Sequence, residues 1–217
     1  MMNSADKTIG WDNGQIANGF GGVDTSQSLD FAAGAGALNL DHAFDQYLTA
    51  GTRDVAGVGG GTVQETGWGL GTISDGTINQ YIIDDQLEGG TELTVTLDWF
   101  REHNSNIDGQ FNEIAQADLQ LFIRDILSGD LIASSVSDFN VVEHLSFLLS
   151  GTSRDAIEVL YQGNTFVNSL FPGTYDSESY GLAWSGVAAQ NIDAPAPGTG
   201  GLLLAGMLLV WRKRWGR

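Results

Sequence analysis

Cysteine is absent from the 217 residues of this chain, and basic residues are scarce. Without cysteine the protein has no disulfide bonds and no thiol chemistry, which leaves its compartment open because many exported bacterial proteins also lack disulfides. Only 9 Lys and Arg residues stand against 27 Asp and Glu residues, and the formal net charge is -18. Such a charge repels nucleic acids and anionic lipid head groups, so we expect neither as a partner of the folded part.

A secretion signal is also missing from the amino terminus of the chain as given. The opening "MMNSADKTIGWDNGQ" has no basic start followed by an apolar run. A Gly-rich stretch, "GVGGGTVQETGWG", has no Gly-Lys-Ser/Thr ending for a phosphate site. We therefore expect residues 57–67 to form a flexible linker.

Between residues 62 and 186, apolar and polar side chains alternate, and this pattern predicts β-strands. In "TELTVTLDWF", Leu93, Val95 and Leu97 lie on one face. Similar runs end at Gly, Ser or Asn turn signals, and Glu143 is a charged exception on the apolar face of one of them. About seven or eight short strands are expected, and an antiparallel, jelly-roll-like β-sandwich is the natural way to bury them.

Several of these runs resemble the sandwich that follows the catalytic domain in secreted bacterial subtilisin-like serine peptidases. The likeness covers residues 93–99, 118–122, 142–145 and 182–184. It indicates architecture more than function, because these are mainly core and turn positions.

The first fifty residues resemble the end of the catalytic domain in the same peptidases. The matching phrases are "MNSADK" at residues 2–7 and "GAGALNLDHA" at residues 34–43. The second phrase leads into a short predicted helix, which Asn39 or Asp41 could cap. Its apolar residues, Phe44, Tyr47 and Leu48, cannot be buried by one helix alone. The alternative is an unrelated Gly-rich surface segment.

The catalytic residues that this family requires are not found in the chain. Subtilisin-like peptidases use a Ser nucleophile, a His base and an Asp that orients the His. The phrase "GTS" ends at Ser153, but Arg and Asp follow instead of the small residues, Ala and Pro of the family. We expect Ser153 in a turn, His42 on the helix, His103 in a polar loop and His144 in a strand. No spacing of these residues predicts a metal site, and the chain itself is predicted not to be an enzyme.

Two further kinds of ligand, Ca²⁺ and sugars, are compatible with residues of this sequence. Asp84 with Asp85, and Asp98 with Glu102, could hold Ca²⁺ through oxygen atoms, although a solvated acidic rim is the simpler interpretation and no cofactor is required. Exposed aromatic side chains could stack on sugar rings, but such residues more often pack in a core or at an edge. The candidates are Trp68, Phe100 and Phe166.

The C-terminal stretch "NIDAPAPGTGGLLLAGMLLVWRKRWGR" combines a proline motif, an apolar run and a basic end. A helix over residues 198–211 would rise about 21 Å, less than the roughly 30 Å of a bilayer core. The stretch resembles the PEP-CTERM sorting signal of exopolysaccharide-producing Gram-negative bacteria, with Pro195, Ala196, Pro197 and Gly198 as the motif. Ala196 departs from the family, which usually has Glu there. The basic membrane stop comprises Arg212, Lys213, Arg214 and Arg217.

We therefore expect a remnant of a catalytic domain at residues 1–56, a linker at 57–67, a sandwich at 68–187, a second linker at 188–199 and a hydrophobic sorting helix at 200–217. The resemblances imply the non-catalytic end of an exported peptidase, anchored transiently in the membrane before it reaches the cell surface or matrix. An exosortase-like enzyme would process its tail. The alternative is a stand-alone, non-enzymatic surface protein whose sandwich binds polysaccharide or protein.

Overall fold

Two β-sheets form the body of the protein. The structure is a computed structural model, and it describes residues 1–48, 52–53, 61–105, 111–170 and 175–188. The larger sheet contains β1 (Ile16–Ala17), β2 (Val23–Thr25), β4 (Gly61–Val63), β6 (Ile78–Ile83), β8 (Glu102–Ser105), β9 (Phe111–Asp125), β10 (Leu131–Ser135) and β12 (Asp155–Val167). The smaller sheet contains β3 (Thr52–Arg53), β5 (Thr66–Ser74), β7 (Thr91–Trp99), β11 (Val142–Leu148) and β13 (Ser177–Ala188). Helix α1 spans Leu40–Leu48.

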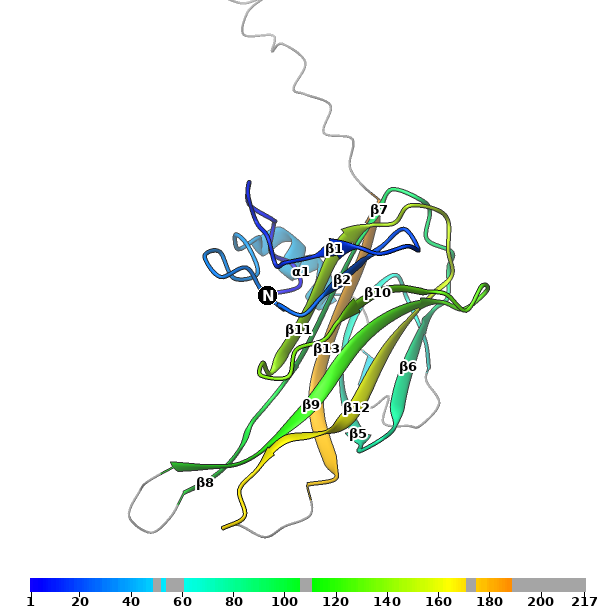
Figure 1. The fold of residues 1–217 in the computed structure, drawn as a ribbon. Helices are drawn as coiled ribbons and strands as arrows, with labels where there is room; N and C mark the ends of the chain where they lie inside the picture. Colours follow the sequence, from blue (N-terminus) through cyan, green and yellow to red (C-terminus); the bar gives the residue numbers. More distant parts are fainter. Residues whose placement is uncertain (49–51, 54–60, 106–110, 171–174, 189–217) are drawn as a thin grey trace, which may run out of the picture.

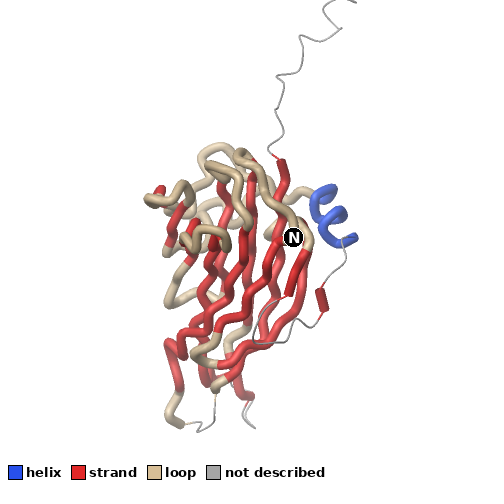
Figure 2. Tube along the Cα trace, turned by 90° about the vertical axis from the view of Figure 1, so that its right-hand side faces the viewer, coloured by secondary structure: helices blue, strands red, loops and turns tan. Residues whose placement is uncertain are grey.

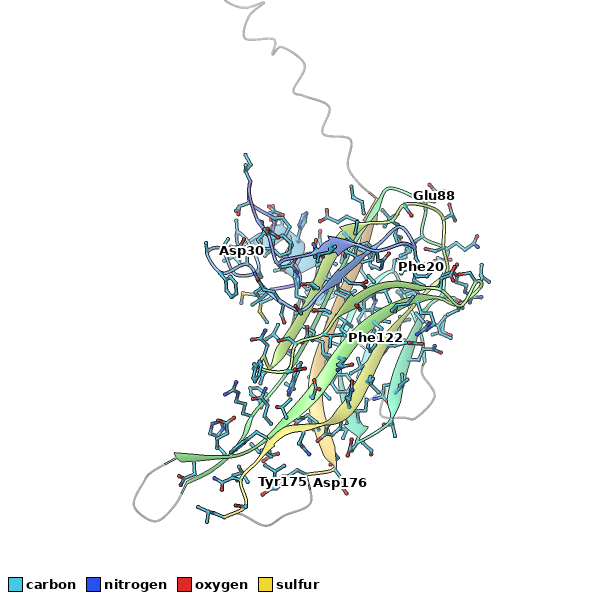
Figure 3. The ribbon with its side chains drawn as sticks, viewed as in Figure 1. Phe20, Asp30, Glu88, Phe122, Tyr175 and Asp176 are labelled. Atoms are coloured by element: carbon cyan, nitrogen blue, oxygen red, sulfur yellow. The ribbon has the colours of Figure 1, made fainter. Side chains whose placement is uncertain are left out.

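The two sheets lie face to face as the layers of a sandwich (Figures 1 and 2). The larger sheet has the order β1-β2-β10-β9-β12-β6-β4, with β8 beside β9, and the smaller has the order β11-β7-β13-β5-β3. Most pairs are antiparallel, while β2–β10, β3–β5 and β4–β6 are parallel. The prediction of a mainly β, two-sheet sandwich is confirmed. Figure 3 places Glu88 at one end of this sandwich, and Tyr175 and Asp176 at the other.

The hydrophobic core fills the space between the sheets. Leu93, Val95 and Leu97 of β7 are fully buried, as the alternation predicts, and Leu119 and Leu121 of β9 are equally buried. Each such side chain stabilises the fold by about 1.5–3 kcal/mol relative to an exposed one. Alternation therefore identified the face of β7 that forms the core.

Glycines of β5 make room for two large rings of β13. A Cβ atom at Gly67 would lie 2.4 Å from Cζ2 of Trp184, and one at Gly71 would lie 2.5 Å from Cζ of Tyr180. The expected linker at residues 57–67 is therefore wrong over its last part, because β4 and the start of β5 lie there. Within this run, Gly67 serves ring packing in a sheet, and residues 57–60 lie outside the described residues.

Residues 1–48, which we call the N-terminal segment, cover one side of the sandwich (Figure 1, blue). Its strand β2 pairs with β10 of the larger sheet, at Asp24 with Ser134. The side chain of Gln15 contacts the free edge of β11 in the smaller sheet, donating to the carbonyl of Ser146 at 3.2 Å. The segment therefore covers the β10 edge of the larger sheet and contacts the β11 edge of the smaller one; strand edges left open invite pairing with other chains.

Candidate functional site

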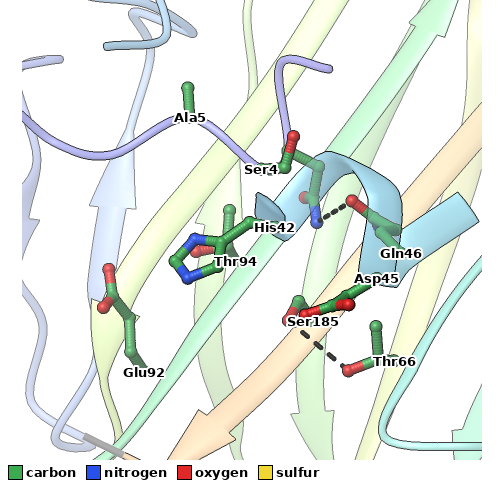
Figure 4. A pocket seen from close by; sticks show the side chains of 10 residues that line it. Ser4, Ala5, His42, Asp45, Gln46, Thr66, Glu92, Thr94 and Ser185 are labelled. Carbon is green, nitrogen blue, oxygen red and sulfur yellow. Dashed lines mark hydrogen bonds between the residues drawn. The ribbon is translucent and has the colours of Figure 1, made fainter. Parts of the chain in front are cut away.

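A polar cleft lies between residues 3–5, α1 and the outer face of the smaller sheet (Figure 4). Its volume is about 360 Å³. The floor is a cross-strand row of hydroxyl groups from Thr94, Ser185 and Thr66, with the last two 3.4 Å apart. The other lining residues are Asn3, Ser4, Ala5, His42, Asp45, Gln46 and Glu92. Hydroxyl, amide and carboxylate groups therefore dominate the cleft.

Helix α1 presents its polar side to this cleft because of how it begins and how it is held. Asn39 caps the helix, since its Oδ1 atom accepts a hydrogen bond from the main-chain nitrogen of His42 at 3.0 Å. Gln46 is the buried residue of the helix, and its amide donates to the main-chain oxygens of Gly67 and Trp184 at 3.0 and 3.2 Å. The helix is thus attached to the sheet through an amide rather than through an apolar face.

A continuous chain of hydrogen bonds runs beneath the cleft from the N-terminal segment into the sheet. The Nζ atom of Lys7 lies 2.8 Å from Nε2 of His144, whose Nδ1 lies 2.8 Å from Oγ1 of Thr96. That hydroxyl donates to Oδ1 of Asn3 at 3.1 Å, and the amide of Asn3 donates to Gln46 at 3.4 Å. We call these five residues the polar chain. They fix the beginning of the N-terminal segment, at Asn3 and Lys7, to β7, β11 and α1.

The direction of these bonds excludes Thr96 and His144 as a nucleophile and base. Because the ammonium group of Lys7 only donates, Nε2 of His144 must accept, and Nδ1 must carry the proton. Nδ1 therefore donates to the hydroxyl of Thr96 and cannot take its proton. Burial, and then the positive charge of Lys7, lower the pKa of His144 to about 3. His144 is also completely buried, so substrate cannot reach it.

Lys7 itself is held on several sides. It donates to the main-chain oxygen of Ala35 at 2.8 Å, and its Nζ atom lies 4.7 Å from the ring centre of Trp11. Burial lowers the pKa of Lys7 to about 8, partly opposed by the negative charges of Glu92 and Asp6. Its contacts are those of a structural residue.

Glu143, the charged exception on an apolar face, is completely buried beside the polar chain. Its Oε2 atom accepts hydrogen bonds from Ser28 and Ser135, while Oε1 has no hydrogen-bond partner. Burial raises the pKa of Glu143 to about 8, although the hydrogen bonds from Ser135 and Ser28 oppose the rise. At neutral pH the folded protein therefore holds this carboxyl group mainly in its protonated form.

An apolar groove of about 540 Å³ lies on the other side of α1. It is lined by Met1, Leu40, Ala43, Phe44, Gln46, Tyr47, Trp68 and Ala183. The side chains of Phe44 and Tyr47 are 60% and 71% exposed. The predicted apolar stripe of the helix is thus present but uncovered within the described residues.

The remaining predicted site residues do not come together into a catalytic or metal centre. Ser153 lies in the connection between β11 and β12, and its hydroxyl donates to Asp155 at 3.0 Å rather than to a histidine. His42 lies on α1 as predicted, whereas His103 lies in β8 and not in a loop. The backbone around His103 pairs with Glu113 of β9, a contact that local sequence does not reveal.

The acidic pairs also remain separate from any metal arrangement in the described part of the chain. Groups of three or more His, Asp or Glu side chains suited to a metal ion do not occur there. Asp84 instead lies 3.6 Å from the guanidinium group of Arg154. Two of the three aromatic candidates stay accessible, with Phe100 79% and Phe166 42% exposed.

The sorting motif, Pro195 to Gly198, and the basic residues from Arg212 to Arg217 lie outside the described residues. Within the described ranges, none of the helices has the length and apolar character needed to cross a membrane.

Sequence reasoning missed Lys7, Asn3 and Gln46 as members of one polar chain. Two signals were present in the sequence. One was the phrase "MNSADK", which ends at Lys7, and the other was the polar residue Gln46 among the apolar residues Phe44 and Tyr47 of the predicted helix. Neither signal names its partners, because Lys7 and His144 are separated by 137 positions.

Comparison with known proteins adds no family assignment. No protein-family model matches the sequence, and no curated protein matches it. Among solved structures, the Yersinia pseudotuberculosis-derived mitogen is similar over 61% of this chain and 93% of its own, at 14% sequence identity. The TM-score of that superposition is 0.31, which is too low to support an argument about fold or function.

Proposed function

We propose that this chain is the non-catalytic C-terminal region of an exported, cell-surface or exopolysaccharide-associated subtilisin-like peptidase. In this proposal the N-terminal segment is the end of a catalytic domain, and the jelly-roll-like sandwich is an accessory domain. The tail, which includes the predicted hydrophobic helix at residues 200–217, is a PEP-CTERM-like signal read by an exosortase-like enzyme. The chain alone is proposed to have no enzymatic activity.

One observation carries the proposal: the N-terminal segment exposes apolar side chains that a neighbouring domain could cover. Ten of the nineteen exposed large apolar side chains in the described part lie within residues 1–48. Phe31 is 93% exposed, Met1 is 83% exposed, and Ile9 is fully exposed. Exposed apolar surface on this scale commonly marks an interface.

The way in which the segment is attached agrees with that interpretation. Its described contacts with the sandwich are largely polar, through Lys7, Asn13 and Gln15. A segment that uses polar groups toward the sandwich and leaves apolar groups outside is suited to lie between two domains. The apolar groove beside α1 is lined by four of the exposed apolar residues, Met1, Leu40, Phe44 and Tyr47.

The decisive experiment is to read the genomic DNA upstream of Met1 in the same frame. An open frame that encodes a signal peptide and the Ser, His and Asp phrases of a subtilisin-like domain would support the proposal. A stop codon and a ribosome-binding site directly before Met1 would overturn it. The alternative, a stand-alone surface protein, would then be favoured.

The sorting role of the tail needs its own test, because it depends on sequence resemblance alone. The full chain would be expressed with an added signal peptide in a host that has an exosortase, and compared with a variant in which Arg212, Lys213 and Arg214 are replaced by Glu. Membrane association of the full chain and its loss in the variant are expected. Equal fractionation of both forms would contradict a membrane stop at these residues.

A further inference from the structure

A second surface feature lies on the outer face of the smaller sheet, away from the polar cleft. It is a trough of about 470 Å³, lined by Leu70, Gly71, Thr72, Asp98, Phe100, Ser179, Tyr180 and Gly181. We call it the β13 trough. Its residues belong to β5, β7 and β13 and to the residue that follows β7.

The register of the strands explains why the surface is hollow here. Gly181 of β13 stands between Leu70 of β5 and Asp98 of β7, and Ser179 stands beside Thr72. Small residues in the central strand thus form the floor, and larger residues on the outer strands form two walls. The wall strands are about 10 Å apart, because each neighbouring strand adds roughly 4.8 Å.

The walls carry the two kinds of group that recognise a sugar ring. Leu70 is 61% exposed, and Phe100 offers an apolar ring that is 79% exposed. Hydroxyl groups of Thr72 and Ser179 and the carboxylate of Asp98 lie between them. A pyranose ring has an apolar C–H face and a rim of hydroxyl groups, so it can contact an aromatic ring and hydrogen-bond to such groups together.

The carboxylate of Asp98 lies in the trough, where the positive charge of the N-terminal amine acts on it. Among the described residues, its carboxylate makes no hydrogen bond or ion pair, and a Cβ atom at Gly181 would lie 2.5 Å from its Oδ1 atom. The absence of a side chain at Gly181 therefore lets Asp98 lie across the floor. Burial raises the pKa of Asp98, partly opposed by the positive charge of the N-terminal amine.

Charge and area decide which kind of occupant fits. Among the described residues no Lys or Arg lines the trough, and the chain has a net charge of -18, so an anionic polysaccharide would be repelled. A stable protein interface usually buries about 1,200–2,000 Å² around an apolar centre. The trough has two exposed large apolar side chains, Leu70 and Phe100, which is a small apolar area for such an interface. We propose that the β13 trough binds an uncharged polysaccharide, with Phe100 stacked on a sugar ring and Asp98 accepting hydrogen bonds from sugar hydroxyls.

The inference concerns the sandwich alone, so it can fail or succeed independently of the proposed link to a peptidase. Affinity electrophoresis of the full chain tests it, with native gels that contain hydroxyethyl cellulose, galactomannan or dextran. Gels that contain alginate serve as the anionic comparison. Retardation by at least one of the neutral polymers, and none by alginate, is expected. Retardation by none of the neutral polymers, or by alginate alone, would overturn the proposal.

Two variants and a matched control locate the site. Phe100→Ala should weaken binding roughly tenfold, since it removes an aromatic contact of about 1.4 kcal/mol. Asp98→Ala should also weaken binding, because hydroxyl groups of the ligand lose their acceptor. Phe139, 77% exposed in the connection between β10 and β11, provides the control Phe139→Ala, which should bind like the unchanged chain. Equal binding by Phe100→Ala and Phe139→Ala would exclude the trough, provided that urea unfolding midpoints show all variants folded.

Discussion

Replacing Glu143 with Gln should remove the fall in the stability of the protein between pH 6.5 and 8. The unfolded chain loses the proton of this group near pH 4.5, whereas the folded protein keeps it to about pH 8. Between these values the folded state binds one more proton than the unfolded state. The unfolding free energy therefore falls as the pH rises through this window.

The magnitude follows from the width of the window. One pH unit corresponds to 1.36 kcal/mol for one proton, and the folded group is half ionised at pH 8, so a rise from pH 6.5 to 8 should remove about 1.6 kcal/mol of the stability that Glu143 contributes. His144 opposes this fall by about 0.4 kcal/mol, because it is neutral in the folded state and loses its remaining half proton in the unfolded state above pH 6.5. Lys7, whose folded pKa is about 8, opposes the fall by a similar amount at the upper end of the window and acts mainly above it.

Urea unfolding at half-unit pH steps, followed by tryptophan fluorescence, measures this slope. Gln has the shape of protonated Glu and its oxygen can still accept from Ser28 and Ser135, so Glu143→Gln should remain folded and lose the downward slope. The exposed residue Glu88 provides the control Glu88→Gln, which should keep it. A flat profile for the unchanged protein, or an undiminished slope in Glu143→Gln, would refute the reasoning.

Three further predictions concern the polar chain and the missing activity. Gln46→Ala should lower the urea-unfolding free energy by about 1–3 kcal/mol, because two buried carbonyl groups lose a donor; no change would contradict that role. Between pH 4.5 and 3, unfolding free energy should fall less in His144→Gln than in the unchanged protein, since unfolded His144 carries a proton there that folded His144 lacks; parallel pH profiles would exclude this cause. The chain should not cleave labelled casein, and activity abolished by Ser153→Ala would show the non-catalytic proposal to be wrong.

Local pattern was sufficient for those parts of the fold that depend on neighbouring residues. The alternation in β7 predicted which side chains enter the core, and Asn39 was one of two predicted caps of α1. Both features depend on residues within one turn or one strand. Their physical basis is therefore visible in a short stretch of sequence.

Features that depend on distant partners could not be predicted in the same way. The Gly-rich start of β5 has the composition of a linker, and its role is clear only when Trp184 and Tyr180 of β13 fill the space above Gly67 and Gly71. The pairing of β2 with β10 joins segments that are about 110 positions apart. Glu143 was noticed as an exception, but its burial depends on Ser28 and Ser135 from two other segments.

The attachment of the N-terminal segment has a consequence for biosynthesis. The segment leaves the ribosome before the strands to which it docks, since His144, to which Lys7 is bound, is made 137 positions after Lys7. Until β10 and β11 have emerged, the segment has neither its β-sheet partner nor the acceptor of its lysine. Its exposed apolar residues, including Ile9 and Phe31, are then available to chaperones and to other nascent chains. Because such long-range contacts form slowly, docking of this segment should be among the last steps of folding and a point at which misassembly begins.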